Sequence, residues 1–184
     1  LHGAHQASNL VTAVAAVEAF VGGGTQPIEH EILLAATAAM TSPGRLEIVR
    51  RSPTVLVDAA HNPAGARSLV AALEEAFAFT RLVGLVGIVA DKDAAAILEV
   101  LQPALDHVVL TRSSSPRAMS PTRLGQLAVE VFGEDRVTVV DHLPDALEQA
   151  VTLAEENGMG GGVVATGSVI TAAEVRMLLG RTEV

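Results

Sequence analysis

The chain has 184 residues, of which 49% are hydrophobic, so it is long enough for one ordinary domain with a sizeable core and a short appendage. It carries 21 acidic and 12 basic side chains, for a formal net charge of −9. A field of that sign repels phosphate, which argues against a general nucleic-acid or anionic-membrane binder. The chain has no cysteine, which excludes disulfides, thiolate metal sites and thiol nucleophiles.

The apolar runs have the length of strands and are broken by glycine or charge, so none is predicted to span a membrane. No signal-peptide pattern opens the sequence, and a cytoplasmic protein is the default expectation. The first residue is Leu1 rather than an initiator methionine, so we expect a fragment of a longer protein.

The first forty residues are predicted to be helical. Apolar side chains at helical spacing indicate a helix over 5–20, which the glycines at 22–24 end. A second helix is expected over 28–40, and the Ser42-Pro43-Gly44 sequence then breaks the chain. We therefore predict a domain boundary there, with a helical segment over 1–41 and a second domain over 42–184.

From residue 45 onward, strand-like apolar runs alternate with amphipathic helices. The expected strands cover 46–49, 54–57, 82–89, 107–110, 137–140 and 162–165, and the expected helices cover 63–77, 93–101, 121–132, 144–156 and 169–179. Continuous Val, Leu and Ile runs are typical of strands buried on both faces. The pattern predicts an α/β, doubly wound domain with a mostly parallel six-stranded sheet and helices on both faces.

Ligands of doubly wound sheets bind beyond the carboxyl ends of the strands. After the predicted strand 54–57, Asp58, His61 and Asn62 share one tight strand-to-helix turn, where a carboxylate can accept ribose hydroxyls and an imidazole can act on a phosphate. The alternative is that Asn62 caps the next helix and His61 is an exposed loop residue. The spacing alone leaves both interpretations open.

Two further strand ends carry candidate ligand groups. Lys92 is the sole lysine of the chain, and between Asp91 and Asp93 it could bind a substrate carboxylate or simply be a solvated residue at a helix start. Ser168 precedes the last expected helix, where it could form an anion pocket with free backbone N–H groups or only cap the helix. No phosphate-binding GxxxxGK[ST] motif occurs, and the scattered histidines do not indicate a metal site within this chain.

Five short segments, taken together and in order, resemble one family. They are GAHQASN (3–9), PGRLE (43–47), DAAHNP (58–63), DKD (91–93) and TGS (166–168), and they extend over nearly the whole chain. This ordered set is similar to the folylpolyglutamate synthases, including the bifunctional dihydrofolate synthases, of the Mur-ligase superfamily. Each segment is weak by itself, but the order is specific.

The resemblance implies that this chain is the C-terminal portion of such an enzyme. Residues 1–41 would be the helical end of a central ATPase domain whose missing N-terminal part carries the P-loop and most Mg²⁺ ligands. Asn9 and Arg45 would contact ATP, Asp58 would hold the ribose, and His61 would lie near the phosphates as the catalytic candidate. Lys92 and Ser168 would be candidates for binding the incoming glutamate.

The activity implied by the resemblance is ATP-dependent addition of L-glutamate to a folate or to dihydropteroate through an acyl phosphate. Without the P-loop, the fragment is expected to be inactive alone. Two alternatives stay open: a ligase of peptidoglycan precursors from the same superfamily, and a non-catalytic doubly wound binding module. The non-catalytic alternative includes a receiver-like module, whose acidic cluster is superficially matched by Asp58, Asp91 and Asp141. Such a module would not explain the PGR segment.

Overall fold

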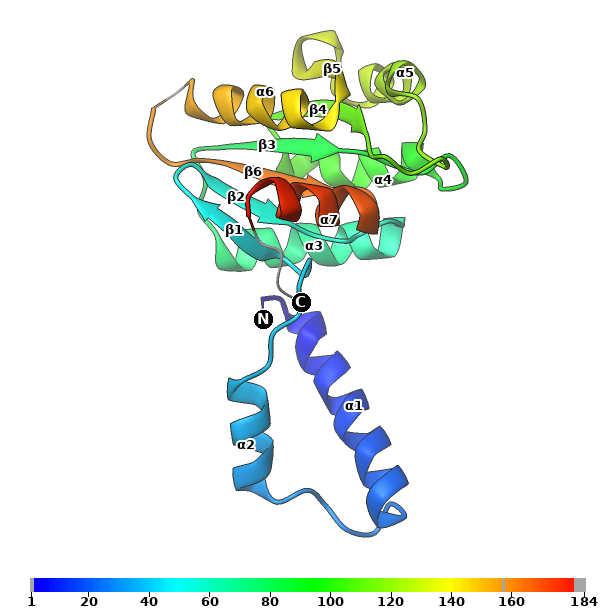
Figure 1. Cartoon of the computed structure of the whole chain (residues 1–184), viewed down its shortest axis with the longest axis vertical. Helices are drawn as coiled ribbons and strands as arrows, with labels where there is room; N and C mark the ends of the chain where they lie inside the picture. Colours follow the sequence, from blue (N-terminus) through cyan, green and yellow to red (C-terminus); the bar gives the residue numbers. More distant parts are fainter. Residues whose placement is uncertain (1, 157, 181–184) are drawn as a thin grey trace.

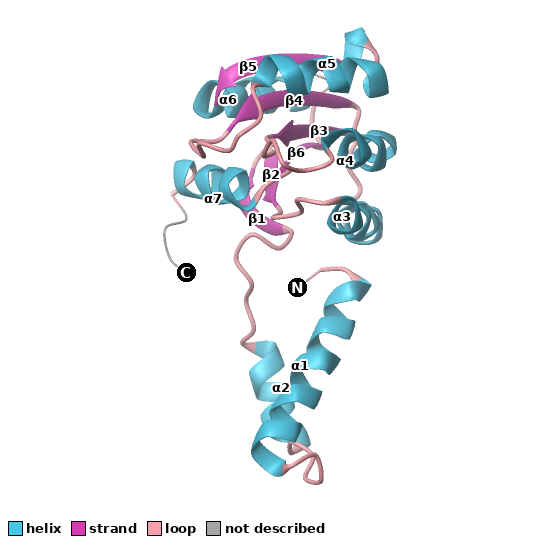
Figure 2. Cartoon of the chain, turned by 90° about the vertical axis from the view of Figure 1, so that its right-hand side faces the viewer, coloured by secondary structure: helices cyan, strands magenta, loops and turns pink. Residues whose placement is uncertain are grey.

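The computed structural model describes residues 2–156 and 158–180, which form a helical pair and an α/β domain (Figure 1). The helical pair consists of α1 (Ala4–Gly22) and α2 (His30–Ala38), and neither helix has a buried residue. Figures 1 and 2 show both helices projecting away from the α/β domain. Apolar side chains of the pair are exposed, among them Val11, Phe20 and Ile32.

The α/β domain is built on a six-stranded sheet in the order β1-β2-β6-β3-β4-β5. Its strands are β1 (Glu47–Arg51), β2 (Thr54–Val57), β3 (Arg81–Val86), β4 (His107–Arg112), β5 (Val137–His142) and β6 (Gly161–Thr166). β1 pairs antiparallel with β2, whereas the four other pairings are parallel. The predicted six-stranded, mostly parallel sheet is confirmed.

Helices cover both faces of the sheet, as predicted (Figure 2). On one face, α3 (Pro63–Ala76), α4 (Ala94–Leu101) and α5 (Pro121–Phe132) pack on a core that includes Leu56 and Leu110. On the other face, α6 (Leu143–Glu155) and α7 (Val169–Leu178) pack on Val57, Leu85 and neighbouring residues. Short 3-10 turns at Gln102–Ala104 and Glu134–Arg136 precede β4 and β5. The two apolar faces of the sheet explain why its strands lack polar alternation.

Several helices that start at the carboxyl edge of the sheet are capped by a side chain at their N-terminus. Asn62 accepts a hydrogen bond from the backbone N–H of Gly65 at 2.8 Å, and Asp93 accepts one from that of Ala96 at 3.1 Å. Each cap satisfies a donor that the first helical turn leaves unpaired. The predicted cap at Asn62 is thus confirmed.

One predicted strand is shorter than expected. β3 ends at Val86, whereas the apolar run continues to Val89. The N–H of Gly87 still donates to Thr166 O at 3.1 Å, but the chain then turns away, and Val89 forms an isolated antiparallel bridge with Ala118. The last apolar residues of this run therefore anchor a loop over the carboxyl edge of the sheet.

Candidate nucleotide and amino-acid site

The carboxyl ends of β2 and β6 lie side by side, because these strands pair in parallel. The turn 58–62 after β2 and the turn 166–168 after β6 are joined by backbone hydrogen bonds. Ala60 O accepts from the N–H of Gly167 at 3.0 Å, and Ala165 O accepts from the N–H of Asp58 at 2.9 Å. The two turns, which carry half of the predicted site residues, thus form one connected piece of backbone.

Asp58 is 9% exposed, and its carboxylate holds two segments of backbone together. Its Oδ2 accepts from the N–H of Leu46 and its Oδ1 from the N–H of Ala60, both at 2.8 Å. Burial raises the pKa of the Asp58 carboxyl, although both hydrogen bonds and the charges of Arg45 and His5 act in the opposite direction. Each oxygen keeps a second lone pair, so a ribose hydroxyl could still donate to this carboxylate.

Arg45 lies at the tip of a tightly held turn. The neighbouring Gly44 has φ 71° and Leu46 has φ 46°, a left-handed conformation that is uncommon for leucine. The N–H of Gly44 donates to Glu47 Oε2, and Gly44 O accepts from the N–H of Ala59, both at 2.8 Å. The turn is fixed at its backbone, while the Arg45 side chain is exposed.

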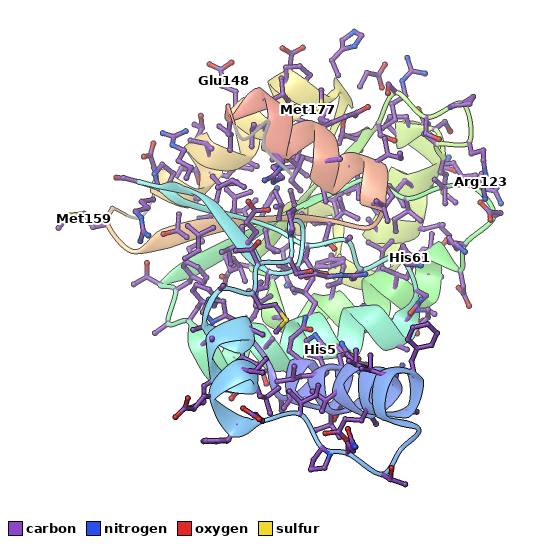
Figure 3. The ribbon with its side chains drawn as sticks, turned by 60° about the horizontal axis from the view of Figure 1, so that its bottom comes forward. His5, His61, Arg123, Glu148, Met159 and Met177 are labelled. Carbon is purple, nitrogen blue, oxygen red and sulfur yellow. The ribbon has the colours of Figure 1, made fainter. Side chains whose placement is uncertain are left out.

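Arg45 and Asp58 line a common cavity with His5 and Gln6 of α1. Its volume is about 110 Å³, below the roughly 300–1,000 Å³ of typical small-molecule sites. The cavity is therefore too small for a whole nucleotide. In Figure 3, His5 lies on α1, close to α3.

Asn9 does not line this cavity in the structure. It is exposed one turn further along α1, and its Nδ2 donates to Gln6 Oε1 at 3.3 Å. The structure therefore brings Arg45 and Asp58 together and leaves Asn9 at the margin. Its contact with ATP stays a prediction.

His61 is half-buried in the turn before α3, and Figure 3 shows it at that corner of the domain. Its Nδ1 lies 2.9 Å from Ala59 O. Because a carbonyl oxygen only accepts, Nδ1 must carry a proton, and the neutral ring presents Nε2 as an acceptor. Donation from Nε2 to a phosphate would require the doubly protonated ring.

Lys92 is half-buried in the loop between β3 and α4, beside an ion pair. Arg117 Nη2 lies 2.7 Å from Asp91 Oδ2, and this contact holds the pKa of the Asp91 carboxyl below its usual value. The N–H of Ala90 donates to Arg117 O at 2.8 Å, so the loop 113–119 and the Lys92 loop are joined by side chain and backbone. The contribution of Arg117 was not predicted, because no local pattern links residues 91 and 117.

Ser168 is buried and caps α7, a role that both interpretations of its position allow. Its Oγ accepts from the N–H of Thr171 at 3.0 Å and lies 2.8 Å from Thr171 Oγ1. The Thr171 hydroxyl donates in turn to Gly87 O at 3.0 Å. Thr171 therefore links α7 to the residue that follows β3, and Ser168 contacts the Thr171 hydroxyl. A direct contact of Ser168 with glutamate stays a prediction.

A larger cavity of about 810 Å³ lies beyond the carboxyl ends of β4 and β5. Arg112, Asp141 and His142 line it from the ends of these two strands. Glu174 and Met177 of α7 close it, and Glu174 accepts from the N–H of Ser114 at 3.1 Å. The contribution of α7 was missed, since Glu174 and Ser114 are 60 residues apart. Lys92 and Ser168 do not line this cavity.

The residues described contain no group of three His, Asp or Glu side chains placed to hold a metal ion. Within the same residues, no helix has the length and apolar character needed to cross a membrane.

Comparisons of this chain with a family model and with known proteins point to the same family. Residues 44–169 match the family model described as Mur ligase, glutamate ligase domain. The chain is 46% identical to dihydrofolate synthase/folylpolyglutamate synthase of Mycobacterium tuberculosis, and the match covers 98% of this chain and 39% of that protein. It is 30% identical to folylpolyglutamate synthase of Lacticaseibacillus casei, with 97% of this chain and 39% of that protein covered.

The fold is also similar to a solved structure. A crystal structure of M. tuberculosis folylpolyglutamate synthase with ADP and AMPPCP superposes with a TM-score of 0.94 at 46% identity, over 100% of this chain and 42% of that one. The chain thus spans about two fifths of the length of the proteins it matches. Since the family model covers most of the α/β domain with its candidate site, the chain belongs to the Mur ligase family and carries its glutamate ligase domain.

Proposed function

We propose that this chain is the C-terminal part of an ATP-dependent ligase that adds L-glutamate to a folate, with dihydropteroate as a second candidate acceptor. The proposal is supported most directly by one arrangement: Arg45 and Asp58 share a cavity, and the Asp58 turn is hydrogen-bonded to the turn that carries Ser168. The similarity to proteins named dihydrofolate synthase and folylpolyglutamate synthase supports the choice of substrates.

In the proposed reaction, the γ-phosphoryl group of ATP is transferred to a carboxylate oxygen of the folate, giving an acyl phosphate and ADP. The amine of L-glutamate then attacks the acyl carbon, and the tetrahedral intermediate loses a proton and expels phosphate to leave an amide. Cationic groups placed where charge develops lower the barriers of such steps. Closure of one domain over another would keep water from the acyl phosphate.

We assign the residues of this chain as follows. Arg45 binds ATP by its exposed guanidinium, Asp58 accepts a ribose hydroxyl, and His61 faces the phosphates. Asn9 contacts the nucleotide from α1. Lys92 and Ser168 serve the incoming glutamate, Lys92 as a point charge for a carboxylate and Ser168 by presenting the first turn of α7.

We further propose that residues 1–41 belong to a central ATP-binding domain and that 42–184 form the C-terminal domain. The support is that α1 and α2 bury no residue, while Phe20 of α1 is 93% exposed and Ile32 of α2 is exposed as well. Apolar surface of this kind is typical of helices that pack against more protein. The P-loop and most of the Mg²⁺ ligands are assigned to the rest of that central domain.

The test is mass spectrometry of reaction products formed by the full-length polypeptide that contains this sequence. It is incubated with ATP, Mg²⁺ and L-glutamate, and separately with dihydropteroate, a reduced folate or a UDP-linked muramyl precursor. A mass gain of one glutamyl unit on either pteridine substrate is expected. Extension of the UDP-linked substrate alone would instead indicate a ligase of peptidoglycan precursors, and no product in any reaction would contradict the proposed activity.

A further inference from the structure

The carboxylate of Glu47 connects the last helix of the domain to the turn that carries Arg45. Its Oε2 accepts from the N–H of Gly44 at 2.8 Å. Arg176 of α7 donates its Nε–H to the same carboxylate, with Nε 3.0 Å from Oε1 and 2.9 Å from Oε2. Residues 47 and 176 are 129 positions apart in the sequence, so only the fold brings them together.

We infer that Arg176 is a positioning residue for nucleotide binding: through Glu47 it holds the turn 44–46 that presents Arg45. This inference rests on the proposed function for its enzymatic readout. Arg176 does not line the cavity shared by Arg45 and Asp58, so it acts through another residue.

Burial makes this ion pair more than a surface contact. The Arg176 and Glu47 side chains are 16% and 22% exposed, which keeps water from competing fully for the carboxylate. Glu47 must satisfy both the guanidinium and the Gly44 N–H. Without the guanidinium, its carboxylate can rotate towards solvent, and the turn loses one of the hydrogen bonds that maintain its two left-handed residues.

The same helix also reaches the candidate amino-acid side of the site. Ser168 caps the start of α7 and Arg176 lies in its last turn, about two helical turns away. A helix is stiff over that distance, so a shift at its capped end changes the position of Arg176 relative to Glu47. α7 therefore connects the glutamate candidate Ser168 with the nucleotide candidate Arg45, and binding at the two places is expected to be coupled.

The domain offers a matched control for this ion pair. Arg81, at the start of β3, lies 3.3 Å from Glu156 and is 18% exposed, close to the value for Arg176. It lies at the amino end of the parallel strands, away from the candidate site. Arg81→Gln removes an arginine of similar burial without touching the turn 44–46.

The experiment uses the full-length polypeptide with the variants Arg176→Gln, Arg176→Lys, Glu47→Gln and Arg81→Gln. We expect Arg176→Gln to raise the KM for ATP about tenfold with kcat within about twofold, which is the signature of lost binding rather than lost chemistry. Arg176→Lys should restore part of the loss, since it keeps a cation near Glu47. The double variant of Arg176→Gln with Glu47→Gln should be no worse than the more impaired single variant, because both single changes break the same ion pair.

Hydrogen exchange gives a readout that does not need activity. The amide hydrogens of Gly44 and Leu46 should exchange faster in Arg176→Gln than in the wild type. In Arg81→Gln they should exchange at the wild-type rate. Unchanged exchange in Arg176→Gln, or an equal increase in both variants, would overturn the inference, as would an unaltered KM for ATP in an active enzyme. If the wild-type protein adds no glutamate, the proposed function fails, and the exchange result alone decides whether Arg176 positions this turn.

Discussion

The Asp58 carboxylate accepts a hydrogen bond from the N–H of Leu46 at 2.8 Å, and Leu46 is the one described non-glycine residue with a positive φ. A carboxylate at the end of β2 thus stabilises a strained backbone conformation just before β1. Local strain of this kind persists only where surrounding contacts determine it. Asp58 therefore shapes the turn of Arg45 as well as bordering the cavity that both residues share.

Asp58→Asn should destabilise the protein and weaken ATP binding together. An amide retains one acceptor, so either Leu46 or Ala60 faces an NH₂ group instead of an oxygen, and the cost is about 1–3 kcal/mol for the donor left unpaired. Urea denaturation and the KM for ATP measure the two effects. A stable Asp58→Asn protein with normal ATP dependence would exclude both roles.

Arg45→Ala should separate binding from stability. The side chain is exposed, and the backbone hydrogen bonds of its turn do not use it, so the unfolding free energy should change by less than about 0.5 kcal/mol. The KM for ATP should rise, with a loss of about 1–3 kcal/mol in binding for a charged contact. If ATP kinetics are unchanged in this variant, Arg45 does not contact the nucleotide.

Lys92→Ala should raise the KM for L-glutamate and leave the KM for ATP near its wild-type value. Loss of a charge-assisted hydrogen bond to a carboxylate predicts an increase of about 10–100-fold. Arg123→Ala is the control, because Arg123 is an exposed cation on α5 (Figure 3). An effect of Lys92→Ala on ATP kinetics alone would show that the glutamate assignment is wrong.

His107 should make stability depend on pH in the acidic range. Its Nε2 lies 2.9 Å from Thr138 Oγ1, and burial together with the positive charges of Arg81 and Arg136 lowers the pKa of the ring, against the opposing charge of Glu156. The folded state then favours the neutral ring. The contribution of His107 to the free energy of unfolding is therefore fully present above the pKa of histidine in the unfolded chain, about 6.5. It is lost as the pH falls from there through the pKa of the folded state.

The variant His107→Gln tests this dependence. Wild-type unfolding free energy, measured by urea denaturation between pH 7.5 and 5, should fall more steeply than that of His107→Gln. His30→Gln serves as the control, since His30 is exposed on α2 and its loss should leave the wild-type slope in place. Parallel pH profiles for wild type and His107→Gln would refute the prediction.

Gly161→Ala should be strongly destabilising. A methyl group at this position in β6 would overlap the carbonyl oxygen of Ala154, which is backbone and cannot rotate away. We expect a loss of about 3 kcal/mol or more in unfolding free energy. Gly65→Ala is the matched control, because its added methyl meets its nearest neighbours at 3.4 Å within α3, where alanine is favoured. Equal stability of the two variants would argue against this packing.

The sequence was sufficient for the type and order of the elements in the α/β domain. Buried parallel strands are nearly continuous apolar runs, and caps such as Asn62 are local features that involve residues three positions apart. Features that depend on tertiary contacts could not be predicted from the sequence. The early end of β3 depends on where Gly87 meets β6, and the apolar run alone contains no sign of it.

In the candidate site, too, some features could be predicted from the sequence and others depend on tertiary contacts. Strand-end position and family resemblance were enough to single out Arg45 and Asp58, which the structure brings to one cavity. The sequence did not indicate that both Asp58 oxygens bind backbone N–H groups, or that Arg176 reaches Glu47. The Asp58–Leu46 and Arg176–Glu47 contacts join residues 12 and 129 positions apart, and no local pattern encodes such distances.

The position of β6 has a consequence for how the domain is made. β6 is the last strand in the chain, yet it lies between β2 and β3, which pair with it and not with each other. During synthesis, the β1–β2 hairpin and the β3–β5 group cannot form a continuous sheet until residues 161–166 have emerged. A nascent chain that stops before Gly161 would present two open strand edges, those of β2 and β3, and such edges are prone to mispairing with other chains.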